Sequence, residues 1–262
     1  MVPMLPKDDL LKGADNVNTL TRVIDQADQA IRTWEPVTTD FLSPPELYEA
    51  QAVFGRLSDI QTQAQGGYPQ AERQRSTIAR AEIPLEGQPI PLALLSVAGN
   101  FLYDTATHRD FLGALLGSGI VREKVGDIIV LGERGAQMIV VPELVDFLSV
   151  SLIQVRSVPV KTKPIDWSEL RIREPKKKEM TTVEASMRLD AVASAGFGMS
   201  RSKMADMITA GDVRVNWKAI SQSSHLVKSG DLVAIRGKGR LEIGEVMVTK
   251  KQRYRIGLTR YV

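Results

Sequence analysis

The chain has 262 residues, 43% of them hydrophobic, and a formal net charge of +3. This length is enough for two or three compact domains, each with a buried core. The sequence contains no cysteine, which excludes disulfides, thiolate nucleophiles and cysteine-based zinc sites. Its first residues lack the apolar core of a signal peptide, and no run reaches the roughly 20 apolar residues that span a bilayer, so we expect a cytoplasmic protein.

Residues 1–80 are expected to be mostly helical. Apolar residues between Val17 and Ala27 recur at helical spacing. Ser43-Pro44-Pro45-Glu46 is typical of a helix start, with an N-cap, prolines in the first turn and an acid at the positive end of the helix dipole. After a turn at Gly66-Gly67-Tyr68-Pro69, we expect a strand over residues 77–83.

Residues 81–162 are expected to form a ferredoxin/RRM-like α/β plait. The pattern predicts strand, helix, two strands, helix and strand, in that order, over residues 92–97, 110–116, 127–131, 137–141, 143–152 and 158–161. The second of the paired central strands lacks the aromatic residues with which RRM proteins stack bases, so the shape does not by itself predict base recognition. Residues 163–182 contain prolines and a run of three lysines, which favours a linker.

Residues 183–262 contain a helix-turn-helix pattern followed by strands and tight glycine turns. The first helix begins near Arg188 and breaks at Gly196-Phe197-Gly198. Ser200 is a favourable N-cap for the second helix, and cations in its first turn suggest a bound phosphate, because the helix dipole alone disfavours them there. The glycines of Arg236-Gly237-Lys238-Gly239-Arg240 let a backbone approach while three cations reach outward.

Positive charge is concentrated in this part of the chain. Residues 1–160 contain 13 Lys and Arg against 20 Asp and Glu, a net −7, whereas residues 161–262 contain 21 against 11, a net +10. Such a distribution is typical of a nucleic-acid module attached to a body that does not bind nucleic acid.

The ordered motifs of this segment resemble the S-four-type RNA-binding domain, named after a ribosomal small-subunit protein. The resemblance rests on these residues: Arg188-Leu189-Asp190, Ser200-Arg201-Ser202, Ile208, Gly211, Val213, Val215-Asn216, Gly230-Asp231 and Ile235-Arg236-Gly237. From the resemblance and the charge we predict these RNA contacts: Arg188, Ser200, Arg201, Ser202, Lys203, Arg214, Asn216, Lys218, Arg236, Lys238 and Arg240. Asp190 is expected to position a nearby arginine, and charge reversal at Arg201 to abolish binding without unfolding the domain.

Further motifs resemble the YlmH family over the chain from about residue 40 onward. They are Ser43-Pro44-Pro45-Glu46, Gly66-Gly67-Tyr68-Pro69, Gly99-Asn100-Phe101 and the segments 108–120 and 122–128. Within the family, the chain looks most similar to the cyanobacterial and plastid branch labelled photosystem II S-four domain proteins. The resemblance implies association with the large ribosomal subunit, while other members are linked to cell division or thylakoid biogenesis.

Enzyme motifs are incomplete. His108-Arg109-Asp110 is similar to a kinase catalytic loop, but Leu115 stands where that loop needs an asparagine, and Gly237-Lys238-Gly239 lacks the arch and hydroxyl of a P-loop. S-four-type domains are often appended to RNA-modifying enzymes, which leaves an accessory to such an enzyme, or a protein scaffold, as the alternative. No catalytic residue, metal or cofactor is predicted.

The sequence thus predicts an α+β protein: a helical N-terminal segment, a ferredoxin/RRM-like plait and a small C-terminal S-four-type domain. Its expected function is non-catalytic recognition of structured ribosomal or transfer RNA, in translation quality control or ribosome assembly. The expected partner is the large ribosomal subunit.

Overall fold

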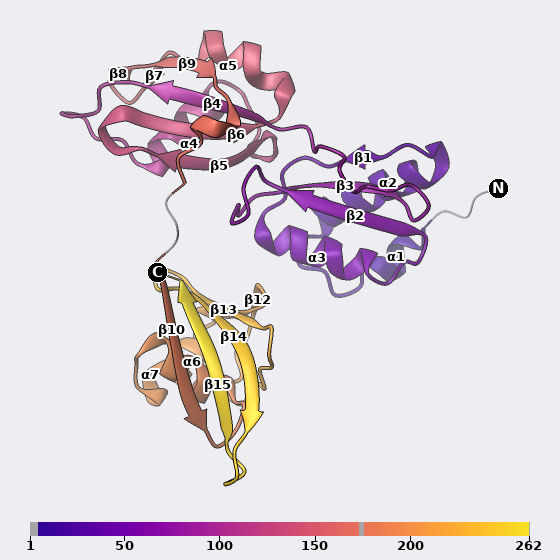
Figure 1. Cartoon of the computed structure of the whole chain (residues 1–262), viewed down its shortest axis with the longest axis vertical. Coiled ribbons are helices and arrows are strands. Elements are labelled where there is room, and N and C mark those ends of the chain that lie inside the picture. Colours follow the sequence, from indigo (N-terminus) through magenta and orange to yellow (C-terminus); the bar gives the residue numbers. More distant parts are fainter. Residues whose placement is uncertain (1–4, 173–175, 262) are drawn as a thin grey trace. The chain divides into compact units, whose positions relative to one another are not determined.

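The structure is a computed structural model that describes residues 5–172 and 176–261 (Figure 1). The chain divides into two compact units, residues 1–172 and residues 173–262. Helices and antiparallel sheets occur in both units, which confirms the predicted α+β class. The first unit contains two lobes with separate cores, and the second unit has a core of its own.

The N-terminal lobe packs helices on a small sheet. It contains α1 (Lys7–Leu10), α2 (Val17–Thr33), β1 (Val37–Thr38), α3 (Pro44–Phe54), β2 (Ile60–Gln65) and β3 (Arg75–Arg80). Helix α2 buries Leu20, Ile24 and Ile31 along one face, as its periodicity predicts. Helix α3 begins after the expected N-cap Ser43, which forms a capping box with Glu46: the side chain of each accepts a hydrogen bond from the backbone N–H of the other.

Three strands also lie in this lobe, in the antiparallel order β1-β3-β2. Of these strands only β3 is predicted from the sequence, and it begins two residues earlier than expected. Strand β2 reads Ile-Gln-Thr-Gln-Ala-Gln, so few of its side chains are apolar and its alternation is weak. Pairing along its whole length with β3, from Ile60 opposite Arg80 to Gln65 opposite Arg75, stabilises it as a strand.

The second lobe is the predicted plait. Its elements are β4 (Ala93–Ala98), α4 (His108–Gly117), β5 (Val125–Val130), β6 (Gly135–Val140), α5 (Val145–Ser151) and β9 (Lys161–Pro164), and the sheet order is β5-β6-β4-β9. Residues 158–159, expected in the last strand, instead form β8 (Val158–Pro159), which pairs with β7 (Gln154–Val155). The closing strand is therefore displaced by three residues.

The C-terminal unit is a six-stranded antiparallel sheet with two helices on one face (Figure 1). Its elements are β10 (Lys177–Glu184), α6 (Leu189–Phe197), α7 (Arg201–Thr209), β11 (Val213–Val215), β12 (Lys218–Ala219), β13 (Leu232–Ile235), β14 (Gly239–Val248) and β15 (Tyr254–Tyr261). The strand order is β10-β15-β14-β13-β11-β12. Leu189, Val192, Leu241 and Ile256 are among the residues that fill the core between helices and sheet.

The linker prediction is wrong for much of residues 163–182. Lys163 and Pro164 belong to β9, and β10 pairs with β15 from Lys177 opposite Tyr261 to Glu184 opposite Tyr254. Residues 173–175 lie outside the described residues. The lysines and prolines suggested a solvated linker, but β10 is an edge strand, where charged side chains on the open face are common.

Candidate nucleic-acid interface

Asp190 lies in the first turn of α6 and accepts hydrogen bonds from two arginines. Arg188 donates from Nε and Nη2 to its two carboxylate oxygens at 3.1 Å each. Arg201, the first residue of α7, donates from Nε and Nη2 at 3.1 and 3.2 Å. Only 7% of the Asp190 side chain is exposed, against 36% for Arg188 and 56% for Arg201. Both guanidinium groups are thus fixed at the surface by one buried carboxylate.

Ionisation of Asp190 fits this arrangement. Burial alone would raise the pKa of the carboxyl, but the hydrogen bonds from Arg188 and Arg201 outweigh burial and hold its pKa below the ordinary value. The same hydrogen bond raises the pKa of Arg188. The predicted positioning role of Asp190 therefore has a direct geometric basis, although part of the charge of Arg201 is neutralised within the protein.

The start of α7 presents further donors and cations. Ser200 has the extended backbone of an N-cap, and its Oγ accepts a hydrogen bond from the backbone N–H of Lys203 at 3.3 Å. Ser200 thus caps the helix as an acceptor, and its exposed hydroxyl can still donate its own O–H to a ligand. The side chains of Ser202 and Lys203 are exposed, so the first turn of α7 offers a hydroxyl and an ammonium group where the helix dipole attracts anions.

Arg260 on β15 joins this helix pair to the basic glycine turn. Its Nη1 donates to the carbonyl oxygen of Phe197 at 3.1 Å, and its Nη2 donates to that of Lys238 at 3.4 Å. Its guanidinium carbon also lies 5.2 Å from the centre of the Phe197 ring. The end of α6, three residues before Ser200, and the turn at residues 236–239 are therefore held close together.

The basic turn itself connects β13 to β14. Gly237 and Gly239 have φ angles of +74° and +90°, a region that favours glycine. Arg236 is exposed and Lys238 is half-exposed. This turn presents both cations at the end of the sheet.

A row of cations crosses the outer face of the sheet at that end. Lys177 lies opposite Tyr261, Tyr261 opposite Arg240, Arg240 opposite Ala234, and Ala234 opposite Arg214. The row spans four strand intervals, or about 19 Å. Lys177 lies with its Nζ 5.9 Å from the centre of the Tyr261 ring, and Tyr261 donates to Glu242 at 2.7 Å.

The β11–β12 hairpin carries the last predicted contacts. Arg214 and Lys218 are exposed on it. The side chain of Asn216, in contrast, already forms hydrogen bonds within the protein. Its Nδ2 donates to Asp231 at 2.8 Å, and its Oδ1 accepts from the backbone N–H of Leu232 at 2.9 Å. The structure gives Asn216 an internal role instead: it fastens the hairpin to the turn that precedes β13.

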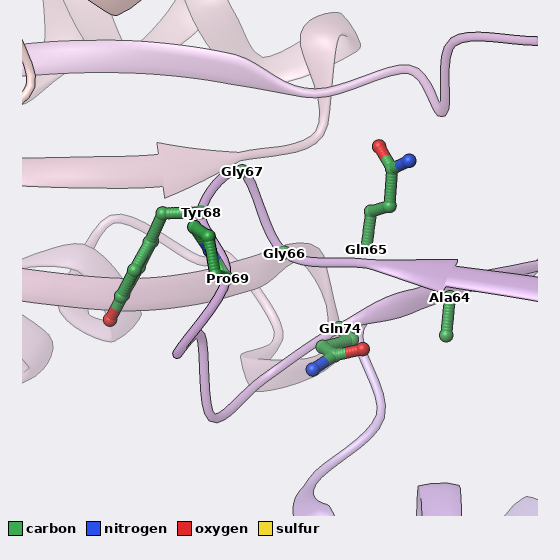
Figure 2. Close-up of a pocket in the computed structure, with 7 residues that line it drawn as sticks. All are labelled: Ala64, Gln65, Gly66, Gly67, Tyr68, Pro69 and Gln74. Atoms are coloured by element: carbon green, nitrogen blue, oxygen red, sulfur yellow. The ribbon is translucent and has the colours of Figure 1, made fainter. Parts of the chain in front are cut away.

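In the first unit, the turn at Gly66 closes against the plait. Tyr68 donates to Asp127 at 2.7 Å, and the same carboxylate accepts from the backbone N–H groups of Glu72 and Arg73. A pocket of about 390 Å³ lies beside the turn and is lined mainly by Gly66, Gly67, Pro69 and glutamines; Figure 2 shows the Tyr68 side chain pointing away from Gln65.

No helix within residues 5–172 or 176–261 is long and apolar enough to cross a membrane, and no group of acidic or histidine side chains in those ranges is placed to hold a metal.

Three family models match consecutive parts of the chain. "YlmH, N-terminal" matches residues 15–83, "Putative RNA-binding domain in YlmH" residues 88–169, and "S4 domain" residues 187–233. The "Ribosome-associated protein quality control protein P2" of Bacillus subtilis (strain 168) is 35% identical over 223 residues, 85% of this chain and 86% of that protein. The chain belongs to the YlmH family.

A solved structure supports the fold of this YlmH-family chain. The "Cell division protein ylmH from Streptococcus pneumoniae" matches with a TM-score of 0.50 and 17% identity, over 58% of this chain and 92% of that one. At this identity the likeness concerns the fold alone.

The plait of this YlmH-family chain differs from an RRM in the face that RRM proteins use to read bases. Leu94, Ile139 and Val141 on that face are buried together with Phe41 of the N-terminal lobe. Gln137 donates to the carbonyl oxygen of Glu169 and accepts from the backbone N–H of Arg171, both at 2.8 Å. The sheet face is therefore covered by the chain itself, which agrees with its lack of stacking aromatics.

Lys177 and Tyr261 share a cross-strand row with Arg240 but are not among the contacts predicted from the sequence. Lys177 was assigned to the linker. The signal was present, because Lys177, Glu179, Thr181 and Val183 alternate with residues on the other face of β10, and Met180 packs against the core.

Proposed function

We propose that this chain is a non-catalytic RNA-binding protein that acts on the ribosome in translation quality control. The relationship to the Bacillus protein supports this role, because the likeness extends over most of both chains. The S4 domain supports RNA as the ligand. Structured ribosomal or transfer RNA on the large subunit is the proposed target.

The observation that carries the proposal is the clustering of cations at one end of the C-terminal unit. Arg260 links the α6–α7 turn to the Arg236–Lys238 turn, and the cross-strand row brings Lys177, Arg240 and Arg214 to the same end of the sheet. Such a surface matches the phosphate backbone of RNA, and phosphate contacts position a protein without selecting a sequence. Structured RNA, not a short sequence motif, is the ligand that this geometry favours.

A scaffold role for the acidic first unit is the second candidate. The observation that favours it is an exposed apolar stripe formed by Phe147 and Val150 of α5 and by Ile153, which follows the helix; their exposed fractions are 46%, 79% and 65%. Exposed apolar groups of this kind are common at protein interfaces. The predicted likeness to the photosystem II S-four branch, and a link to thylakoid biogenesis or to an RNA-modifying enzyme, stay predictions.

Sedimentation with purified ribosomal subunits tests the proposal. The full chain is expected to travel with large subunits at about 50 mM salt and to dissociate as salt rises, because counterion release makes phosphate contacts salt-dependent. Crosslinking followed by sequencing of the bound RNA then identifies the contacted helices. Absence from both subunits, with no RNA crosslinked, would contradict the proposal, and salt-resistant binding that survives RNA digestion would favour the scaffold.

A further inference from the structure

Trp217 occupies a backbone conformation that a tryptophan rarely adopts. The β11–β12 hairpin has a two-residue turn, since Val215 lies opposite Lys218 and only Asn216 and Trp217 are left between them. Their φ angles are +48° and +70°. Positive φ at both positions is characteristic of a type I′ turn, in which asparagine suits the first position and glycine the second. A bulky residue at the second position strains the backbone.

The surroundings hold the turn in this strained form. The backbone N–H of Asn216 donates to the carbonyl oxygen of Leu232 at 2.8 Å, while its side chain bonds to Asp231 and Leu232. Arg214 donates from Nη1 to the carbonyl oxygen of Trp217 at 3.3 Å. The turn would accept glycine without strain, so its geometry does not explain why a tryptophan stands there.

Packing does not explain the tryptophan either. Within residues 176–261, the side chains that build the C-terminal core or pack on it include Ile220 and Val213 but not Trp217. The indole is half-buried and sits on the hairpin tip. Burial in the core therefore does not offset the cost of the strained backbone.

The neighbours of Trp217 are two exposed cations. Lys218 follows it in sequence, and Arg214, paired with Ala219 across the hairpin, bonds to its carbonyl group. An aromatic residue with long cations beside it is the arrangement by which proteins stack an unpaired base and contact the adjacent phosphates. Strain at such a position is often retained for a binding function.

We propose that Trp217 stacks on an unpaired nucleobase of the bound RNA, while Arg214 and Lys218 contact the adjacent phosphates. This inference rests on the proposed RNA-binding function and adds the kind of RNA feature that is recognised. The C-terminal unit then distinguishes a hairpin loop or bulge from a continuous duplex, because only unpaired bases are free to stack on a side chain.

The test compares Trp217→Gly and Trp217→Phe in the full chain, with an RNA hairpin and a fully paired RNA duplex of the same length as probes. Trp217→Gly is expected to unfold at the same or a higher temperature, because glycine relieves the strained φ. Its affinity for the hairpin is expected to fall about tenfold, as loss of one stacked base requires. Its affinity for the duplex and its salt dependence should not change, and Trp217→Phe should retain most of the hairpin affinity.

Trp34→Gly is the matched control. Trp34 also has a positive φ of 60°, but it lies in the first unit, where Arg80 stacks on its ring with the guanidinium carbon 3.7 Å from the ring centre. Its replacement should leave hairpin affinity unchanged.

Two results would overturn the inference while leaving the proposed function intact. One is an unchanged hairpin affinity for Trp217→Gly when the wild-type chain binds the hairpin. The other is a parallel loss of melting temperature and of affinity for both RNAs, which would make Trp217 a structural residue. Failure of the wild-type chain to bind either RNA at low salt would instead contradict the proposed function itself.

Discussion

Arg201 contacts Asp190 side-on through Nε and Nη2, and the carboxylate that it holds is almost completely buried. The contact joins the first turns of two consecutive helices. It also corrects the expectation that charge reversal at Arg201 would abolish binding and leave the fold intact, because a glutamate at this position would meet a buried carboxylate.

Arg201→Glu is therefore expected to lower the free energy of unfolding by roughly 1–3 kcal/mol and to weaken RNA binding as well. The comparison variant is Lys203→Glu, because Lys203 is exposed and forms no ion pair within the described parts of the chain. It should change stability by less than about 0.5 kcal/mol while still weakening binding. Thermal unfolding and RNA titration of both variants measure this, and an Arg201→Glu protein as stable as wild type would contradict the geometry.

The stabilising effect of the Asp190 carboxylate should depend on pH. The pKa of this carboxyl in the folded chain lies below its ordinary value of 3.8. The ionised carboxylate therefore contributes its full stabilisation at pH values above 3.8. This contribution is lost as the pH falls through the folded pKa. Urea unfolding of wild type and Asp190→Asn at pH 7, 5 and 3 should therefore show a stability difference that is constant at the upper two values and smaller at pH 3. A difference that grows toward acid pH would have the wrong sign.

Asn216→Ala is expected to destabilise the C-terminal unit by about 1–3 kcal/mol. The substitution leaves Asp231 and the backbone N–H of Leu232 without their present partner. It also places alanine at a φ of +48°, which asparagine tolerates better. The slope of RNA affinity against salt should stay unchanged, because no phosphate contact is removed. A variant with wild-type stability and a reduced salt slope would show that Asn216 contacts RNA after all.

In the first unit, Tyr68→Phe is expected to cost about 1 kcal/mol of stability, since it removes one hydrogen bond to Asp127. Asp127→Asn should cost more, because the carboxylate also accepts from the backbone N–H groups of Glu72 and Arg73. Neither change should alter RNA affinity in a filter-binding assay. A loss of affinity in Tyr68→Phe at unchanged stability would mean that the Gly66–Tyr68 turn contacts RNA.

Helices and turns that depend on local signals could be predicted from the sequence. Ser43 and Ser200 start helices as N-caps, and Gly237 and Gly239 take the positive φ angles that their turn requires. The plait was also predictable, because its strands and helices follow one another in the order typical of a ferredoxin-like fold.

Contacts between distant residues could not be predicted in the same way. The Asp190–Arg201 pair spans eleven positions and the Arg260–Phe197 bond spans sixty-three. The alternation along β10 is a weak signal in a lysine-rich segment, and pairing with β15, 70 to 84 residues later, is what stabilises the segment as a strand. Trp217 gave no pattern signal, since only the φ angles of the folded turn show that it is out of place.

The central claim, that RNA binds at the basic end of the C-terminal unit, is tested by moving the same charge change between the two ends of one sheet. Arg236→Glu with Lys238→Glu alters the β13–β14 turn, and Lys250→Glu with Lys251→Glu alters the exposed β14–β15 turn at the opposite end of β14. RNA affinity of the full-length proteins is measured between about 50 and 200 mM salt. The first double variant should bind RNA at least tenfold more weakly, and the slope of log affinity against log salt concentration should become shallower by about two. The second double variant should stay close to wild type. Equal losses from the two pairs would contradict the account, because they would show a response to net charge and not to a site.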